Sequence, residues 1–186
     1  MKLLLHVCCA PCSVACIASL REEGIEPVLF WNNPNIHPFT EYSKRRDTLL
    51  QYASDLDLKV IESGRYGLKQ FVGNLEQIVK EDPSFSVLDF PRRCTWCYRM
   101  RMESTALAAK ENGFDAFSTT LFISPYQDHN LLKDEASAAA EKHGPALFYR
   151  DFRPLFREGR AEAKALGLYM QKYCGCIFSE ADRYDT

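Results

Sequence analysis

The chain has 186 residues and a formal net charge of −2, with 46% apolar and 26% charged residues. This composition is typical of a folded globular domain, and we expect a single domain over residues 1–186. It excludes a strongly basic chain, so any contact with nucleic acid has to come from a local patch of charge. No stretch approaches the ~18 apolar residues of a membrane span, and the first apolar run is too short for a signal peptide. We therefore expect a cytoplasmic protein.

Short apolar runs alternate with segments of helical spacing along the chain. The predicted strands are residues 3–7, 26–33, 59–63, 115–122 and 146–152. The predicted helices are residues 12–23, 41–57, 68–80, 94–112, 131–144 and 159–173, the last one broken near Gly167, and residues 82–93 are expected to be irregular. Alternating strands and helices indicate βαβ units. We predict an α/β fold with three layers around a doubly wound, mostly parallel sheet, Rossmann-like and similar to the PP-loop and HUP layout.

The eight cysteines gather in three clusters, and the first cluster directly follows the first predicted strand. Ligands bind at the carboxyl ends of the strands in such sheets, so we expect a metal site at this edge. The segment lacks the glycines of a phosphate-binding loop, which disfavours a nucleotide-dependent tRNA ligase or thiolase. The clusters are Cys8, Cys9, Cys12 and Cys16; Cys94 and Cys97; and Cys174 and Cys176.

The spacing within these clusters indicates metal or redox chemistry, because a reducing cytoplasm disfavours structural disulfides. Two residues between Cys94 and Cys97 allow both sulfurs to face one ion. The C-G-C motif of Cys174 and Cys176 could bind a metal or close a small redox-active disulfide. Cys16 has the spacing of a core residue, and we expect it to be simply buried. A structural zinc site is the alternative, but it needs only four thiolates, fewer than the chain offers.

Six motifs, in this order, resemble those of the cobalamin-independent epoxyqueuosine reductase family: HVCCAPC, NPNIHP, YSKRR, RCTWCYRMR, TTLFISPYQDH and QKYCGC. The resemblance extends from Leu5 to Cys176. It implies an enzyme that reduces epoxyqueuosine at the tRNA wobble position to queuosine, with a [4Fe–4S] cluster and a second redox element beside it. The implied cluster ligands are Cys8, Cys9, Cys94 and Cys97. The second element would be Cys174 and Cys176, as a dithiol or as ligands of an additional mononuclear iron, to which Cys12 is also assigned.

Reduction of an epoxide to an alkene consumes two electrons and two protons, whereas a [4Fe–4S] cluster ordinarily passes one electron at a time. A dithiol or a second iron would supply the second store, and an electron donor outside the chain has to refill both. An iron with an open position would also act as a Lewis acid on the epoxide oxygen. Cleavage of the C–O bond makes an alkoxide, so we expect a proton donor nearby. The candidates are Tyr126, Asp128 and His129, although Asp128 is equally suited to cap the following helix.

A tRNA substrate requires a local basic surface. Between Arg92 and Arg101 there are four arginines and no acidic residue, with Trp96 and Tyr98 interleaved. Arginines hold phosphates and aromatic rings stack on unpaired bases. The predicted tRNA contacts are Arg92, Arg93, Arg99, Arg101, Lys44, Arg45 and Arg46. The alternative to an enzyme is a non-catalytic, zinc-stabilised RNA-binding module, which the surplus of thiols disfavours.

Overall fold

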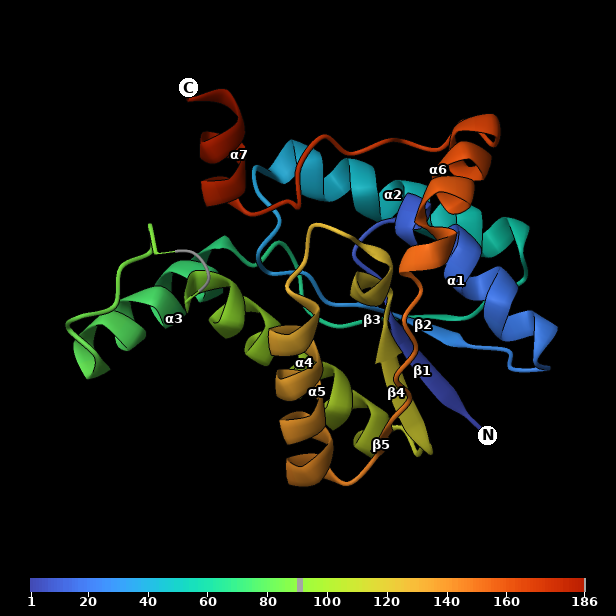
Figure 1. Ribbon diagram of the computed structural model, residues 1–186, viewed down its shortest axis with the longest axis horizontal. Helices are drawn as coiled ribbons and strands as arrows, with labels where there is room; N and C mark the ends of the chain where they lie inside the picture. The colour runs from blue at the N-terminus through green and yellow to red at the C-terminus, as the bar shows by residue number, and fades with distance from the viewer. Residues whose placement is uncertain (90–91, 186) are drawn as a thin grey trace.

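The computed structural model describes residues 1–89 and 92–185. Five strands form one parallel sheet in the order β3-β2-β1-β4-β5 (Figure 1). The strands are β1 (Leu3–His6), β2 (Val28–Trp31), β3 (Val60–Glu62), β4 (Ala116–Thr119) and β5 (Ala146–Leu147). The predicted α/β class is therefore confirmed, with a sheet that is entirely parallel in the described residues.

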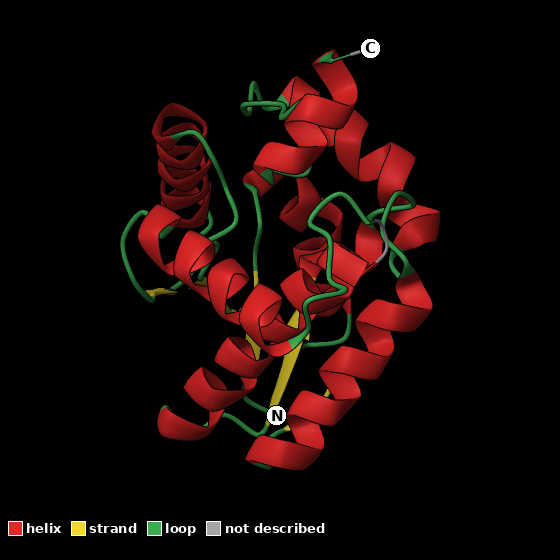
Figure 2. Cartoon of the chain, turned by 90° about the vertical axis from the view of Figure 1, so that its left-hand side faces the viewer, coloured by secondary structure: helices red, strands yellow, loops and turns green. Residues whose placement is uncertain are grey.

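Helices cover both faces of the sheet and enclose the strands (Figure 2). The helices are α1 (Ala10–Glu22), α2 (Phe39–Asp55), α3 (Leu68–Glu81), α4 (Arg92–Glu111), α5 (His129–His143), α6 (Phe156–Ala165) and α7 (Ile177–Tyr184), with short 3-10 helices η1 (Thr120–Ile123) and η2 (Arg153–Leu155). α4 packs beside α5 on one face, and α1 packs beside α6 on the other. α3 and α7 lie outside these two layers, at one end of the molecule (Figure 1).

The sequence of β1 explains its central place. Leu3, Leu4 and Leu5 are completely buried, as expected for a strand covered by helices on both faces. The strand ends at His6 and α1 begins at Ala10 with a proline in its first turn, where a missing N–H costs nothing. Only three residues join the two elements, so the first cysteines lie in a tight turn at the carboxyl edge of the sheet.

The structure differs from the predicted boundaries at several places. α1 begins at Ala10, so it contains Cys12 well inside its first turn. The fourth predicted strand ends early, because residues 120–123 form the 3-10 helix η1. The predicted break of the last helix near Gly167 is confirmed, because α6 ends at Ala165 and Gly167 turns the chain with a φ of 70°, but the helix predicted beyond it, over residues 168–173, is wrong. Residues 166–176 are extended or turning, and α7 was not predicted.

The segment of residues 82–93, expected to be irregular, ends in the structure at the start of α4, which begins at Arg92. Its residues 90 and 91 lie outside the described residues. Within the described part of the chain, no helix combines the length and the apolar character needed to cross a membrane.

Candidate metal centre

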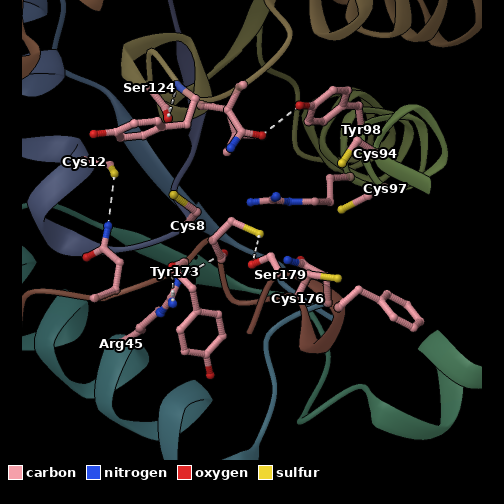
Figure 3. Close-up of a pocket in the computed structure, with 18 of the residues that line it drawn as sticks. Cys8, Cys12, Arg45, Cys94, Cys97, Tyr98, Ser124, Tyr173, Cys176 and Ser179 are labelled. Carbon is pink, nitrogen blue, oxygen red and sulfur yellow. Dashed lines mark hydrogen bonds between the residues drawn. The ribbon is translucent and has the colours of Figure 1, made fainter. Parts of the chain in front are cut away.

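A pocket of about 860 Å³ opens at the carboxyl ends of β1 and β4. The chain winds away from these two strands in opposite directions, which makes this the point where open parallel sheets hold ligands. The Cys8 amide donates a hydrogen bond to Thr120 Oγ1 at 3.4 Å, joining the segments that follow the two strands. Figure 3 shows Cys8 and Cys12 on one side of the space, with Cys94 and Cys97 on the other. Six of the eight cysteines line it: Cys8, Cys12, Cys94, Cys97, Cys174 and Cys176.

The first cluster brings together three sulfurs from the turn between β1 and α1 and from the first turn of α1. The Sγ atoms of Cys8, Cys9 and Cys12 all lie within 4.8 Å of one another, and those of Cys8 and Cys9 are 3.7 Å apart. Cys9 is extended (φ −172°, ψ 154°) and directly precedes the helix. The Gln171 amide donates to Cys9 Sγ at 2.9 Å and to Cys12 Sγ at 3.4 Å. Three sulfurs at this separation suit a shared metal centre.

The three thiols of this cluster differ in their pKa values. Hydrogen bonds from Cys12 and Cys9 hold the pKa of Cys8 well below its usual range, and the charge of Arg101 adds to this effect. Burial raises the pKa of Cys9, and hydrogen bonding with Cys8 raises that of Cys12. Cys8 is therefore the first thiolate of the cluster. A metal that binds here has to displace the protons of the other two sulfurs.

The second cluster lies on one face of α4. Cys94, Cys97 and Arg101 occupy positions i, i+3 and i+7, which share a side of a helix, and all three line the pocket. Burial raises the pKa of Cys94 to about 12. Burial also raises the pKa of the Cys97 thiol, and the charge of Arg101 opposes that rise.

The third cluster lies on the loop that precedes α7. Gly175 has a φ of 107°, and a Cβ there would lie 2.9 Å from the Ile36 side chain, so only glycine fits between the two cysteines. Cys174 is exposed and donates to Ser179 Oγ at 3.0 Å, whereas burial raises the pKa of Cys176 to about 12. Both thiols are free and line the pocket.

Arg45 on α2 holds this loop in place through hydrogen bonds. Its side chain is 1% exposed and donates from Nε to Glu41 Oε1 at 2.6 Å. The same guanidinium donates to the carbonyls of Tyr173 at 2.8 Å and Cys174 at 3.0 Å. The Tyr173 hydroxyl in turn donates to the His37 carbonyl at 2.6 Å. The arginine predicted as a tRNA contact is thus enclosed by protein and holds the C-G-C loop in place.

The three predicted proton donors are placed differently. Tyr126 is 78% exposed and lines the pocket. The Asp128 carboxylate accepts hydrogen bonds from two amides of α5 and caps that helix, which is the alternative left open by the sequence. His129 is buried against Phe122, with ring centroids 5.7 Å apart, and burial lowers its pKa. Neither Asp128 nor His129 is among the described residues that line the pocket.

Most of the basic residues predicted to contact tRNA have partners within the chain. The ion pairs are Arg92 with Asp82, Arg93 with Asp182, Arg99 with Glu135, Arg45 with Glu41 and Arg46 with Glu62. Lys44 lies over the ring of Tyr169, and Arg101 donates to Asn33. Three other basic residues line the pocket: Arg160, Lys172 and Arg183.

Two residues of the site escaped the sequence reasoning. Gln171 touches two thiols from a segment that was predicted as helix, and its place in the QKYCGC motif was the available signal. Asn33 begins the NPNIHP motif and was assigned no role in the site, yet its amide donates to the Val7 carbonyl at 2.9 Å and its oxygen accepts from Arg101. Cys16, in contrast, is buried as predicted, and its thiol donates to a backbone carbonyl.

Comparison with known proteins decides the family. The family model described as epoxyqueuosine reductase QueH matches residues 3–182. The chain belongs to the epoxyqueuosine reductase QueH family. It is 34% identical over 183 residues to a protein of that name from Dehalococcoides mccartyi, covering 98% of this chain and 94% of the relative.

Two other relatives of the same name agree with this assignment. The one from Thermotoga maritima is 34% identical and is covered to 91%, and the one from Acinetobacter baylyi is 35% identical and is covered to 81%. Each alignment takes in 97% of this chain. The predicted resemblance is therefore confirmed, and the chain is an oxidoreductase of this family.

Proposed function

We propose that this chain reduces epoxyqueuosine in tRNA to queuosine in the pocket at the carboxyl ends of β1 and β4. The observation that carries the proposal is the meeting of three cysteine clusters, from the start, middle and end of the chain, in one pocket at the sheet edge. The reaction converts the epoxide to an alkene and releases its oxygen as water, with two electrons and two protons consumed. The names of the relatives support this reaction, and the pocket supports a metal-dependent route to it.

The thiols fit a [4Fe–4S] cluster, which binds four cysteine thiolates and supplies single electrons when bound. We assign its ligation to Cys8 and Cys9, whose sulfurs are 3.7 Å apart, and to the α4 pair. The proposed ligands are Cys8, Cys9, Cys94 and Cys97. The remaining thiols are proposed for the second redox element, with Cys12, Cys174 and Cys176 as ligands of an additional iron or the last two as a dithiol.

Tyr126 is the proton donor that we favour, because among the three predicted donors it is the one in the wall of the pocket. A phenol can protonate the alkoxide as the C–O bond breaks. Asp128 already accepts two backbone hydrogen bonds, and the buried His129 faces Phe122. We therefore assign these two residues to the N-terminus of α5, where they hold the Tyr126 segment.

The substrate base has to leave its stack to reach the sulfurs, because they line the wall of a recessed pocket. The exposed basic side chains of Arg160 and Lys172 line the same pocket and are suited to hold the flanking phosphates. An electron donor outside the chain has to return the two electrons after each turnover.

The test is anaerobic purification, followed by iron and sulfide analysis, a visible spectrum, and an assay with tRNA that carries epoxyqueuosine. We expect a brown protein whose colour bleaches on reduction, with iron and sulfide in the ratio of a [4Fe–4S] cluster, and formation of queuosine. A colourless protein that holds only zinc after anaerobic reconstitution would contradict the proposal and favour the zinc-stabilised RNA-binding module.

A further inference from the structure

Arg101 is a buried cation in the middle of α4, and its side chain belongs to the wall of the pocket. The residue is 4% exposed. Its Nη2 donates to Asn33 Oδ1 at 2.9 Å, and Asn33 is fixed in turn by the Val7 carbonyl. The Nε of Arg101 has no hydrogen-bond partner in the described residues. The guanidinium is therefore held rigidly but is incompletely satisfied by the protein.

The charge of Arg101 also lacks a carboxylate partner. Three arginines are buried in the described residues, and two of them form ion pairs: Arg45 with Glu41 and Arg93 with Asp182. Arg101 has no ion pair with any carboxylate in residues 1–89 and 92–185. Burial of an unpaired charge is strongly unfavourable, so the partner of Arg101 has to be another kind of anion.

Two thiols share the wall of the pocket with Arg101. Cys97 lies one turn earlier on the same face of α4, and Cys8 lines the same pocket after β1. The charge of Arg101 lowers the pKa of both thiols, although for Cys97 burial has the larger, opposite effect. Figure 3 shows Cys8 and Cys97 on opposite sides of the pocket, whose lining also includes Arg101.

We propose that Arg101 is the counter-charge of the thiolate metal centre and raises its reduction potential. The guanidinium stabilises negative charge on the sulfurs, and it stabilises the reduced centre more, because each added electron increases that charge in a medium of low dielectric constant. The inference rests on the proposed metal centre. It gives Arg101 an electrostatic role toward the sulfurs in place of the predicted contact with tRNA.

The test compares two variants of Arg101 in the loaded protein by anaerobic redox titration. Arg101→Gln removes the charge but keeps an amide donor for Asn33, and Arg101→Lys keeps the charge. We expect Arg101→Gln to shift the one-electron reduction equilibrium at least tenfold toward the oxidised form, which is about 59 mV, and Arg101→Lys to restore most of the difference. Lys110→Gln is the matched control, since this exposed residue of the same helix loses the same charge far from the pocket.

A second readout separates the counter-charge from a packing role and does not use activity. The unfolding temperature of the iron-free and the loaded protein is measured for each variant. If Arg101 is a counter-charge, Arg101→Gln should reduce the difference in unfolding temperature between the loaded and the iron-free protein. If Arg101 only packs, the substitution should lower both temperatures equally. Arg101→Met replaces the glutamine variant if that one does not fold.

Two results would overturn the inference. One is a wild-type potential in Arg101→Gln, and the other is an equal fall in Arg101→Gln and Arg101→Lys, which would assign the effect to hydrogen-bond geometry. A wild-type protein that binds no iron–sulfur centre would instead contradict the proposed function itself. If the wild-type protein binds the centre but Arg101→Gln leaves its reduction potential unchanged, only the counter-charge role of Arg101 is contradicted.

Discussion

At the scale of single residues, the surroundings of Cys16 separate it from the cysteines with a proposed role in the site. Cys16 lies one helical turn after Cys12, but its thiol points into the core and donates to the Cys12 carbonyl. Cys97 lies in the pocket wall beside Arg101, and the exposed Cys174 lies on a loop. These three thiols therefore differ in what their removal would do.

We predict that Cys97→Ala loses the iron–sulfur centre, because one of four cluster ligands is removed. Cys174→Ala should retain part of the centre and lose turnover, because this residue is assigned to the second redox element. Iron and sulfide analysis with a visible spectrum measures the first effect, and the tRNA assay measures the second. Cys16→Ala is the control and should keep its iron. Equal iron content in wild type and Cys97→Ala would refute the ligand assignment.

The Tyr126 hydroxyl gives a second prediction at this scale. Tyr126→Phe should lower kcat about 100-fold or more, the usual effect of losing a general acid, and leave the Kd for tRNA unchanged. Tyr149→Phe removes the hydroxyl of another exposed tyrosine, one outside the pocket lining, and should leave both constants at their wild-type values. A wild-type kcat in Tyr126→Phe would exclude this tyrosine as the proton donor.

At the scale of elements, the loop before α7 is placed by α2 and by the segment after β2. Arg45 on α2 donates to two carbonyls of the loop, and the Gly175 carbonyl accepts from the His37 amide at 2.8 Å. The ion pair between Arg45 and Glu41 is almost fully buried. Removal of one partner of such a pair leaves an uncompensated charge, so the anchor contributes to stability as well as to position.

We predict that Arg45→Met lowers the free energy of unfolding by about 3 kcal/mol, because Glu41 is left unpaired and two carbonyls lose their donor. The freed loop should also expose Cys174 to faster alkylation in the iron-free protein. Denaturant titration and alkylation kinetics measure the two effects. Arg46→Met, the next residue, breaks a half-exposed ion pair with Glu62 and should cost less than about 1 kcal/mol with no change in alkylation. Equal behaviour of the two variants would contradict the anchor.

At the scale of the whole molecule, a chain with a net charge of −2 has to attract tRNA through a local surface. Arg160 on α6 and Lys172 in the following segment are both exposed, and both line the pocket. Many of the arginines in the predicted basic motifs are instead neutralised by carboxylates of the same chain. The basic surface that we propose therefore comes from the last quarter of the chain.

The double variant Arg160→Ala/Lys172→Ala should weaken tRNA binding and reduce its dependence on salt. Two lost phosphate contacts correspond to a decrease of about 1.4 in the slope of log K against log salt for a single-stranded segment. Arg157→Ala/Lys164→Ala removes the same charge from positions of α6 outside the pocket lining and is the control. Binding titrations at several salt concentrations measure this slope for each protein. Equal slopes for both double variants would contradict the proposed surface.

The sequence by itself determined the class of the fold and the family. Each strand and each helix buries one part of its surface against a neighbouring layer, and this burial leaves a repeating pattern of apolar residues in the sequence. That pattern predicts five strands and the helices between them. The C-x-x-C spacing on α4 is local as well, and the motif order identified the family. The predicted break near Gly167 is confirmed, but the helix predicted beyond it does not form: Gly167 turns the chain in a left-handed conformation, and residues 168–173 do not resume helical geometry.

Only the tertiary structure decided which charged residues face solvent and which face the sulfurs. Arg45 bonds to the Cys174 carbonyl 129 residues away, and Arg101 bonds to Asn33 at a separation of 68 residues. In the sequence both arginines belong to basic motifs that favour an exposed surface for tRNA. Burial of a side chain depends on the packing of elements that are distant along the chain, and local sequence carries no measure of it. For that physical reason the anchor of the C-G-C loop and the unpaired cation beside the thiols became visible only in three dimensions.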